Sequence, residues 1–361
     1  MIQFYLPIIV VLILLVIITF FTLKRKSNSF NNIKISKYSY KPKTSSNEEK
    51  NLTIKTVEYQ IIKNKNKILP DASIIVPCRN EVNNLKNTIN SLMSSKNSHK
   101  FEIIIVDDGS TDRSIEFLND FKYDDVILIK TKNAGSAGSR NIGAKEARGR
   151  YLFFCDAHIS VPNHWIDNLI ETMIKHDASA VAPAILNMEN DFIVGYGQTW
   201  NHTLEIRWLK EKPEEITEIP IAPGCAFCIT KKAFYSVGGF HPYFEVWGKE
   251  DEELSFKLWL FGHKIVVNPN VEVKHLFRKR HPYHVTTGNV IHNLLCIAYS
   301  HMEYKNLAKV INFAKKDPFF SSAMAKILLN KDLLDLRELF FKNRVYDENF
   351  FFEKFKIPFI Y

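Results

Sequence analysis

Short apolar runs alternate with helix-like segments through the first half of this 361-residue chain, and this alternation restricts the fold more than any other feature. Each run is four to six residues long, which suits a strand that is buried on both faces. Strands that alternate with helices predict an α/β fold with a doubly wound, mainly parallel central sheet. The predicted strands are residues 73–76, 101–106, 126–129 and 151–155, and the predicted helices are residues 84–94, 112–121 and 137–147.

The second half of the chain has a mixed pattern. Its tail, from about residue 285, is helical and rich in phenylalanine. This tail could cover the core or rest on a membrane, and packing on the core is the favoured interpretation. The other predicted elements are strands at 52–62, 180–186, 221–229 and 265–267, with the first at a sheet edge, and helices at 165–176 and 252–261.

The N-terminal segment is apolar enough to cross a membrane. Residues 1–23 contain no charged side chain, and as a helix they would extend about 34 Å, against ~30 Å for the hydrocarbon layer. A cleaved signal peptide is the alternative, but a basic N-terminal region and a small-x-small cleavage site are missing. Lys24, Arg25 and Lys26 follow the segment. The positive-inside bias therefore predicts a single-pass N-terminal membrane anchor with the rest of the chain in the cytoplasm.

The excess positive charge lies next to this segment. Residues 24–67 contain 12 Lys or Arg and 3 Asp or Glu, whereas the chain from residue 68 onward has 36 of each sign. A basic juxtamembrane linker suits anionic lipid headgroups, and a merely solvated linker is the alternative. Because the folded part has no basic surplus, we expect no nucleic-acid partner. The expected parts are a transmembrane helix at 1–23, the linker at 24–70, an α/β domain at 71–305 and a helical, aromatic-rich extension at 306–361.

A candidate metal site follows the strand predicted at 151–155. Asp156 and His158 are two residues apart, so their side chains point to the same side of an extended chain. A carboxylate oxygen and an imidazole nitrogen together suit a borderline cation such as Mn²⁺, which leaves further coordination positions for a pyrophosphate. Taken alone, Asp-x-His is a weak signal, because an ordinary turn at a strand end produces it too.

Three further polar segments stand near strand ends, and they give the metal motif a context: residues 77–81 (PCRNE), 106–112 (VDDGSTD) and 133–143 (NAGSAGSRNIG). A carboxylate at a strand end, that of Asp108 or less favourably Asp107, can accept a hydrogen bond from an N–H group of a ligand. Arg140 would offset phosphate charge with forked donors. Gly135 and Gly138 would let the backbone approach a ligand closely. A capped turn at 107–110 and a chance likeness to a dinucleotide fingerprint are the plainer alternatives.

With Asp156-Ala-His158, this ordered series resembles the nucleotide-sugar-binding half of family-2 glycosyltransferases of the GT-A fold. Blocks in the second half resemble polypeptide N-acetylgalactosaminyltransferases, and the likeness covers about residues 71–305. The family's His-x-Phe-Arg motif supplies the third protein ligand of Mn²⁺. The resemblance thus implies Asp156, His158 and His275 as ligands of Mn²⁺, with Mg²⁺ as the alternative. The blocks are residues 200–208, 239–243, 246–259 and 275–283.

The resemblance also implies roles around the donor sugar. Trp247 and Gly248 would belong to a loop that closes near the sugar, and Glu250 would bond to its hydroxyls. His281 and Tyr283 would belong to a lid over the pyrophosphate. The implied donor-binding set is Pro77, Arg79, Glu81, Asp107, Asp108, Arg140, Trp247 and Gly248.

Asp251 departs from the resemblance, because the retaining enzymes have asparagine after this glutamate. Glu250-Asp251 looks like the Glu-Asp pair of inverting family-2 enzymes, in which the aspartate takes the acceptor proton. The plainer interpretation is a pair of acidic residues at a helix N-terminus. We expect inversion with Asp251 as the base, although the metal ligands look like those of the retaining branch.

Together these features predict a metal-dependent glycosyltransferase that uses a UDP-sugar. A cytoplasmic domain favours a lipid-linked or envelope-polysaccharide acceptor. The alternatives are a retaining transferase acting on polypeptide Ser or Thr, a catalytically silent UDP-sugar-binding module, and a nucleotidyltransferase.

Overall fold

The computed structural model describes residues 58–63, 69–82, 84–119 and 125–359, which all lie in one compact unit. The membrane segment predicted at 1–23 and the linker up to residue 57 lie outside the described residues. In the part of the chain that is described, no helix is long and apolar enough to span a bilayer.

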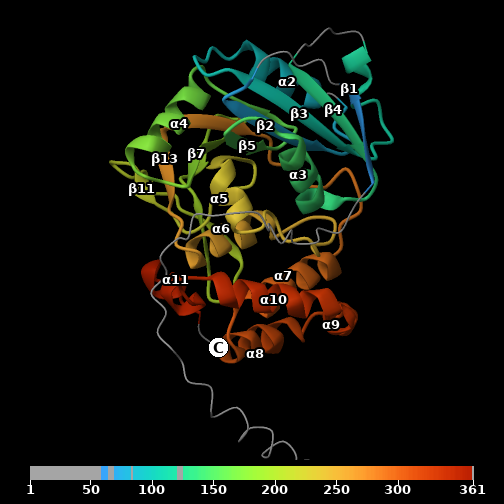
Figure 1. Ribbon diagram of the computed structural model, residues 1–361, viewed down its shortest axis with the longest axis vertical. Coiled ribbons are helices and arrows are strands. Elements are labelled where there is room, and N and C mark those ends of the chain that lie inside the picture. The colour runs from blue at the N-terminus through green and yellow to red at the C-terminus, as the bar shows by residue number, and fades with distance from the viewer. Residues whose placement is uncertain (1–57, 64–68, 83, 120–124, 360–361) are drawn as a thin grey trace, which may run out of the picture. The chain divides into compact units, whose positions relative to one another are not determined.

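One eleven-stranded mixed sheet forms the centre of the described fold (Figure 1). The strand order is β1-β4-β3-β2-β5-β12-β7-β13-β11, with β6 paired to β13 and β8 to β7. The strands are β1 (Tyr59–Lys63), β2 (Ala72–Cys78), β3 (Phe101–Asp108), β4 (Val126–Thr131), β5 (Tyr151–Cys155), β6 (Ile159–Ser160), β7 (Ala180–Asn187), β8 (Ile193–Gly195), β11 (Thr217–Glu218), β12 (Ala226–Thr230) and β13 (Ile265–His275). A separate hairpin consists of β9 (Gln198–Trp200) and β10 (Ile206–Trp208).

The prediction of a mainly parallel sheet is correct for the central strands, but the sheet as a whole is mixed. Strands β4, β3, β2 and β5 are mutually parallel, β7 and β13 also pair in parallel, and β1 is an antiparallel edge strand on β4. Strand β12, however, enters antiparallel between β5 and β7. Side-chain periodicity does not encode strand direction, so the sequence could not reveal this reversal. It places the beginning of β12 next to the end of β5, where the Cys225 carbonyl accepts a hydrogen bond from the Asp156 amide at 3.0 Å.

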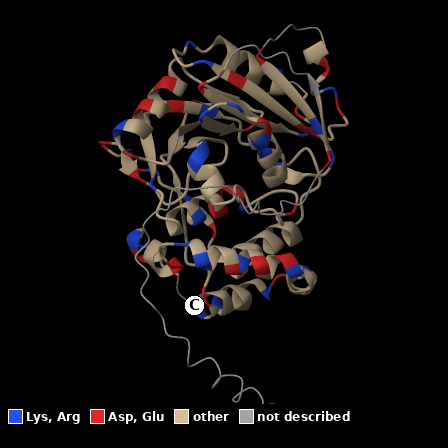
Figure 2. Ribbon diagram, viewed as in Figure 1, with Lys and Arg blue, Asp and Glu red and all other residues tan. Residues whose placement is uncertain are grey.

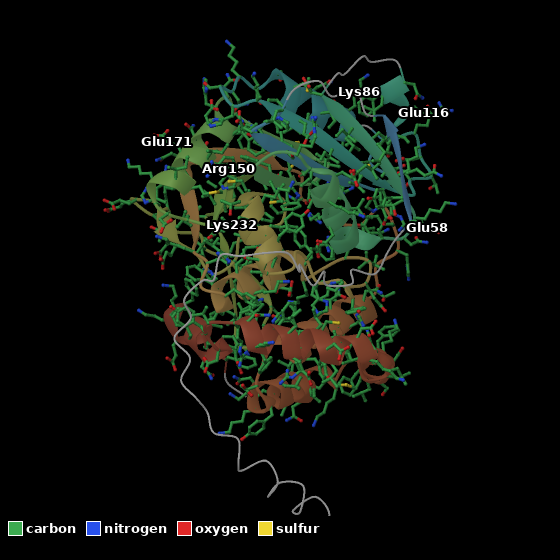
Figure 3. All side chains as sticks on the ribbon, viewed as in Figure 1. Glu58, Lys86, Glu116, Arg150, Glu171 and Lys232 are labelled. Atoms are coloured by element: carbon green, nitrogen blue, oxygen red, sulfur yellow. The ribbon has the colours of Figure 1, made fainter. Side chains whose placement is uncertain are left out.

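Helices cover both faces of this sheet because successive strand residues point to opposite sides. Ile74 and Ile103 pack with α2 and α4, whereas Ile75 and Ile104 pack with α3 and α6. Side chains fill the space between the sheet and these helices (Figure 3). The helices of this layer are α2 (Asn84–Ser94), α3 (Gly135–Glu146), α4 (Trp165–Lys175), α5 (Lys231–Ser236) and α6 (Glu250–Leu260).

The prediction of a helix at 112–121 is wrong for residues 112–119, which are the described part of this range. Only a short 3₁₀ helix, Glu116–Asn119, forms there. Asp112 accepts hydrogen bonds from the backbone N–H groups of Val82 and Ser114, at 3.1 and 2.9 Å. Bonds between side chains and the local backbone compete with a regular helix, and here they determine the turn.

The C-terminal helices pack together beside the sheet layer (Figure 1). Phe340, Phe351 and Phe352 are buried, and Phe351 contacts the rings of Trp200 and Phe256. Packing on the core is therefore confirmed for these aromatic residues. The helices are α7 (Thr287–His301), α8 (Tyr304–Ala314), α9 (Phe320–Leu329), α10 (Lys331–Asn343) and α11 (Glu348–Lys354).

Charge of both signs is spread over the described sheet and helices (Figure 2). This agrees with the equal numbers of acidic and basic residues from residue 68 onward.

Candidate functional site

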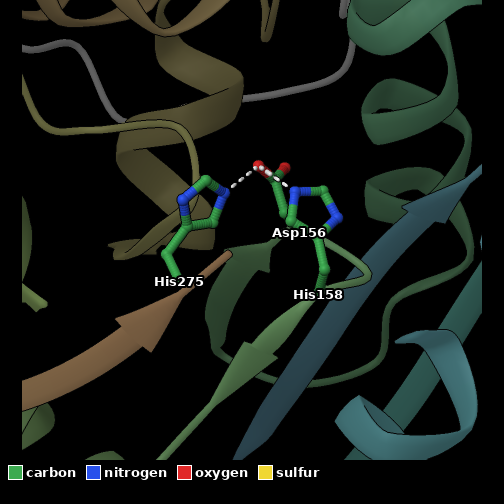
Figure 4. A group of neighbouring side chains, drawn as sticks. All are labelled: Asp156, His158 and His275. Carbon is green, nitrogen blue, oxygen red and sulfur yellow. Dashed lines mark hydrogen bonds and ion pairs between the residues drawn. The ribbon is translucent and has the colours of Figure 1, made fainter. Parts of the chain in front are cut away.

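Three side chains from distant parts of the chain meet at the end of β5. Asp156 follows β5, His158 precedes β6, and His275 ends β13. The antiparallel pairing of β6 with β13 aligns His275 with Ile159, next to His158. The Oδ2 atom of Asp156 lies 3.2 Å from His275 Nε2 and 3.9 Å from His158 Nε2. Figure 4 shows both rings beside this carboxylate.

These three donors fit a divalent cation. One carboxylate oxygen and two imidazole nitrogens all lie within 4.8 Å of one another, which suits atoms placed about 2.0–2.2 Å from a shared ion. Burial lowers the pKa of His275, despite its hydrogen bond with Asp156, and keeps the imidazole neutral. Burial alone would raise the pKa of Asp156, but His275 and Arg140 together lower it well below its usual value. Both ligand groups are therefore in their metal-binding protonation states.

Glu81 lies behind His158. Its Oε1 atom is 3.3 Å from His158 Nδ1 and 2.6 Å from Arg278 Nη2. Carboxylates in this position orient a ligating imidazole. Glu81 thus lines the cleft, but its carboxylate is engaged by protein groups. The contact with Arg278 was missed from the sequence, although Arg278 belongs to the same motif as His275.

Arg140 connects the metal cluster to α6. Its Nη2 atom lies 2.8 Å from Asp156 Oδ1, and its Nη1 atom lies 3.3 Å from Glu250 Oε1. Ser136 Oγ also accepts from Nη1 and donates to Glu250. Burial alone would lower the pKa of Arg140, but Asp156 and Glu250 raise it, so the side chain stays cationic. A permanent cation beside the cluster can neutralise further phosphate charge.

The N-terminus of α6 forms the opposite wall. Glu250 Oε2 accepts from the Gly248 amide at 2.8 Å, and Asp251 Oδ2 accepts from the Gly224 amide at 2.8 Å. Burial, together with the charges of Glu250 and Glu252, raises the pKa of Asp251 to about 7. A buried carboxyl group in a cleft with its pKa raised in this way is typical of acid–base sites.

At the other end of the site, Asp108 is the last residue of β3 and is buried. Its Oδ1 accepts from the Ala134 amide at 2.7 Å and its Oδ2 from the Gly135 amide at 3.0 Å. Arg79 Nη1 is 3.8 Å from Oδ2. Asp107 instead accepts from the Ser110 amide at 3.0 Å and is not among the residues that line the cleft, so the geometry favours Asp108 of the two.

The segment that carries His281 and Tyr283 lies over the site. The His281 ring is 4.4 Å from the Trp247 ring, and Arg79 lies 5.5 Å from the centre of the Tyr283 ring. Asn80 donates to the Pro282 carbonyl at 3.2 Å. The segment therefore contacts both ends of the site, as a lid would.

Most of these residues line one cleft of about 540 Å³. Sequence reasoning missed Ser136, Gln198, Gly224 and Arg278, which contribute to the same walls. Ser136 lies in a segment that the sequence had marked, whereas nothing in the sequence marked Gln198. The predicted residues that the structure brings together are Pro77, Arg79, Glu81, Asp108, Arg140, Asp156, His158, Trp247, Gly248, Glu250, Asp251, His275, His281 and Tyr283.

Comparison with known families agrees with this geometry. The sequence model of glycosyl transferase family 2 matches residues 73–241, which contain Asp108, Arg140 and Asp156. Residues 73–241 form a glycosyl transferase family 2 domain. A second model, described as the N-terminal domain of galactosyltransferase, matches residues 211–284 and includes Glu250 and His275. The predicted resemblance to family-2 glycosyltransferases is therefore confirmed for the matched residues.

Several relatives of this family 2 domain share the name polypeptide N-acetylgalactosaminyltransferase. A Drosophila melanogaster protein provisionally named polypeptide N-acetylgalactosaminyltransferase 13 is 31% identical over an alignment of 288 residues, and the match covers 67% of this chain and 51% of that protein. Caenorhabditis elegans polypeptide N-acetylgalactosaminyltransferase 5 is 31% identical over an alignment of 248 residues, and the match covers 62% of this chain and 40% of the relative. The chain thus spans about half, or less, of the length of these relatives.

Solved structures show the same fold. The crystal structure of GalNAc-T7 with UDP, GalNAc and Mn²⁺ has a TM-score of 0.64 at 21% identity, over 80% of this chain and 57% of that one. The structure of S. aureus TarS 1–349 with UDP-GlcNAc has a TM-score of 0.52 at 15% identity, over 79% and 90% of the two chains. The family 2 domain therefore has a GT-A-like α/β fold with a mixed central sheet.

Proposed function

We propose that this chain transfers a sugar from a UDP-sugar to an acceptor hydroxyl, with Mn²⁺ bound by Asp156, His158 and His275. The observation that carries this proposal is the placement of these three ligands next to Arg140 in the 540 Å³ cleft. A cation site beside a fixed guanidinium is suited to a diphosphate. The GalNAc-T7 and TarS structures support UDP as the nucleotide, since they were solved with UDP and with UDP-GlcNAc.

Each wall of the cleft has a separate task in this proposal. When bound, the metal would supply Lewis acidity to the departing diphosphate. Arg140 would neutralise the charge that develops on the same group. Arg79 and Asp108 would hold the nucleotide end, and Trp247 with Glu250 would form the sugar end. The lid at His281 and Tyr283 would exclude water from the reacting atoms.

The acceptor that we propose is a polypeptide hydroxyl, with retention at the anomeric carbon. The support is the shared name of the relatives, which are polypeptide N-acetylgalactosaminyltransferases. These names favour a polypeptide over the lipid-linked or polysaccharide acceptor that the sequence had suggested.

A second candidate is an inverting reaction with Asp251 as the base. It is favoured by one observation, the pKa of about 7 that burial and Glu250 give to Asp251. A carboxylate with a pKa near the working pH is well suited to accept a proton. Under retention, Asp251→Asn should lower kcat by less than about tenfold, because no base is removed. A loss of about a thousandfold or more, with unchanged UDP affinity, would favour inversion.

The proposal is tested by UDP release. We expect the purified full chain to release UDP from one member of a UDP-sugar panel with Mn²⁺, and to stop when EDTA is added. NMR of the transferred sugar on a Ser/Thr peptide gives its anomeric configuration. Absence of metal-dependent UDP release from every donor would contradict a transferase, and pyrophosphate release from a nucleoside triphosphate would indicate a nucleotidyltransferase.

A further inference from the structure

Buried polar atoms without a hydrogen-bond partner gather around the cleft. Among the described residues, six buried side-chain atoms lack a partner, and four of these belong to residues that line the cleft. An unpaired buried polar atom destabilises a fold, so such atoms mark positions that a ligand can complete. The four are Ser139 Oγ, Arg140 Nε, Gln198 Oε1 and His275 Nδ1.

Gln198 differs from Arg140 and His275 because it lies far from the metal cluster in the chain and has no role in the proposed chemistry. Its side chain is only 8% exposed, and its amide oxygen has no partner among the described residues. It nevertheless lines the cleft. Its amide oxygen is therefore a buried hydrogen-bond acceptor that is available to a ligand in this part of the cleft.

The position of Gln198 is fixed relative to the reacting end of the site. Its backbone exchanges two hydrogen bonds with Ile221, at 2.9 and 3.1 Å. Three residues further, the Gly224 amide donates to Asp251 Oδ2 at 2.8 Å. One short segment thus joins the β9–β10 hairpin to the N-terminus of α6. A hydrogen-bonding group held in this way is preorganised for recognition.

The face of the hairpin that meets the cleft is set by its register. Gln198 pairs directly with Trp208, and cross-strand partners lie on the same face. Both residues line the cleft, whereas Thr199, which points to the other face, does not.

The hairpin meets the cleft on the side of Asp251, to which residues 221–224 connect it. The nucleotide end is formed by Arg79 and Asp108, at the carboxyl ends of β2 and β3, where ligands of such sheets bind. The metal cluster follows, and Asp251 with the hairpin residue Gln198 forms the part that remains. A donor that occupies the first two parts leaves the third for the group that receives the sugar.

We propose that Gln198 is a specificity-determining residue whose Oε1 accepts a hydrogen bond from a backbone N–H of the acceptor polypeptide. This inference rests on the proposed function, which supplies the polypeptide class. A polypeptide offers one backbone N–H at each residue other than proline, whatever its sequence. The buried Oε1 atom of Gln198 therefore favours peptides whose main chain, next to the modified Ser or Thr, brings an N–H group within hydrogen-bonding distance of it.

The test uses the full chain with Mn²⁺, the UDP-sugar that gives the fastest UDP release, and a Ser/Thr peptide of twelve residues. Gln198→Leu removes the acceptor atom at similar volume, and Thr199→Ala changes the other face of the same strand. We expect Gln198→Leu to raise the KM for the peptide about tenfold, and to leave UDP affinity and acceptor-free UDP release unchanged. Thr199→Ala should match the wild type. Gln198→Asn, which keeps the amide but withdraws its oxygen, should give a smaller increase and serves if the leucine variant does not fold.

A peptide series makes the assignment specific. Each backbone N–H is replaced in turn by N–CH₃. One position should lower kcat/KM of the wild type about tenfold and have no further effect on Gln198→Leu, as expected for two partners of one hydrogen bond.

Equal methylation effects in the wild type and in Gln198→Leu would overturn the inference and leave the proposed function intact. So would a KM for Gln198→Leu within about twofold of the wild type. If the wild type releases UDP but modifies only a saccharide, the polypeptide acceptor and the role of Gln198 both fail. These results are distinguishable, because the last appears already in the wild type.

Discussion

The two carboxylate oxygens of Asp156 contact different groups. Oδ1 lies 2.8 Å from Arg140, and Oδ2 lies 3.2 Å from His275. The sequence predicted a metal ligand at Asp156 from its spacing to His158, and it implied His275 only through family resemblance. The structure brings these residues together across 119 positions of the chain. A contact over that separation depends on the pairing of β6 with β13, which local sequence does not encode.

We predict that the substitution His275→Ala abolishes the thermal stabilisation of the protein by Mn²⁺ and UDP. The variant loses one nitrogen ligand, so the ligand-dependent rise in Tm should disappear. The measurement is a thermal melt with and without Mn²⁺ plus UDP. His263→Gln is the matched control, because His263 contacts Ser179 and Ser236 outside the cleft. An undiminished rise in Tm for His275→Ala would contradict the metal assignment.

At Asp251 we predict a stability effect that depends on pH. The folded pKa of about 7 exceeds the ordinary value of 3.8, so the folded state holds a proton that the unfolded state releases. The stability that this proton provides is complete below about pH 4 and is lost as the pH rises to about 7. Asp251→Asn should therefore be more stable than the wild type at pH 8, by about 2–4 kcal/mol, and equal to it near pH 4.

Denaturant unfolding at these two pH values measures the difference. Asn can still accept from the Gly224 amide, so the comparison isolates the charge. Equal free energies of unfolding at pH 8 would show that the Asp251 carboxyl is not held in its neutral form.

At the scale of elements, the start of α3 packs closely against the segment before α6. Gly135 has φ +72°, and a Cβ atom there would lie 3.0 Å from the Val246 carbonyl oxygen and 3.2 Å from its nitrogen. The Ser136 amide also donates to that carbonyl at 2.7 Å. This close approach holds Ser136 and Glu250 within hydrogen-bonding distance of Arg140.

We predict that Gly135→Ala destabilises the protein by about 2–3 kcal/mol and raises the KM for the UDP-sugar. Gly262→Ala is the matched control. Gly262 also has a positive φ, of +81°, but the nearest atom to its added Cβ is 3.6 Å away. The control should cost only about 1 kcal/mol, with unchanged KM. If both variants lose the same free energy of unfolding, the close contact of Gly135 with Val246 contributes nothing to stability.

Elements were predicted best where periodicity and burial agree. Residues 84–94 have apolar side chains spaced for one helical face, and α2 has the predicted bounds. Residues 112–121 were predicted as a helix, but Asp112 and Ser114 bond to the backbone of a neighbouring turn. The partners of those bonds are distant in sequence, so the pattern could not indicate them.

At the scale of the whole molecule, the sequence predicts a membrane anchor that lies outside the described residues. We propose that residues 1–23 hold the chain at a membrane, with the family 2 domain in the cytoplasm. Deletion of residues 1–23 should move the protein from the membrane fraction to the soluble fraction, and UDP release should persist. Reversal of the charges at Lys24, Arg25 and Lys26 is the control for orientation. Unchanged fractionation of the deletion variant would contradict the anchor.

Local sequence by itself determined most of the strands and helices near the site and the identity of its polar residues, because hydrophobic periodicity and turn chemistry act over a few positions. Tertiary structure alone decided the antiparallel entry of β12, which brings Gly224 to Asp251. It also decided the complete burial of Lys257 on α6, where Glu253 compensates its charge. These outcomes depend on which distant segments pack together, and the free energy of that packing belongs to the pair of segments rather than to either one.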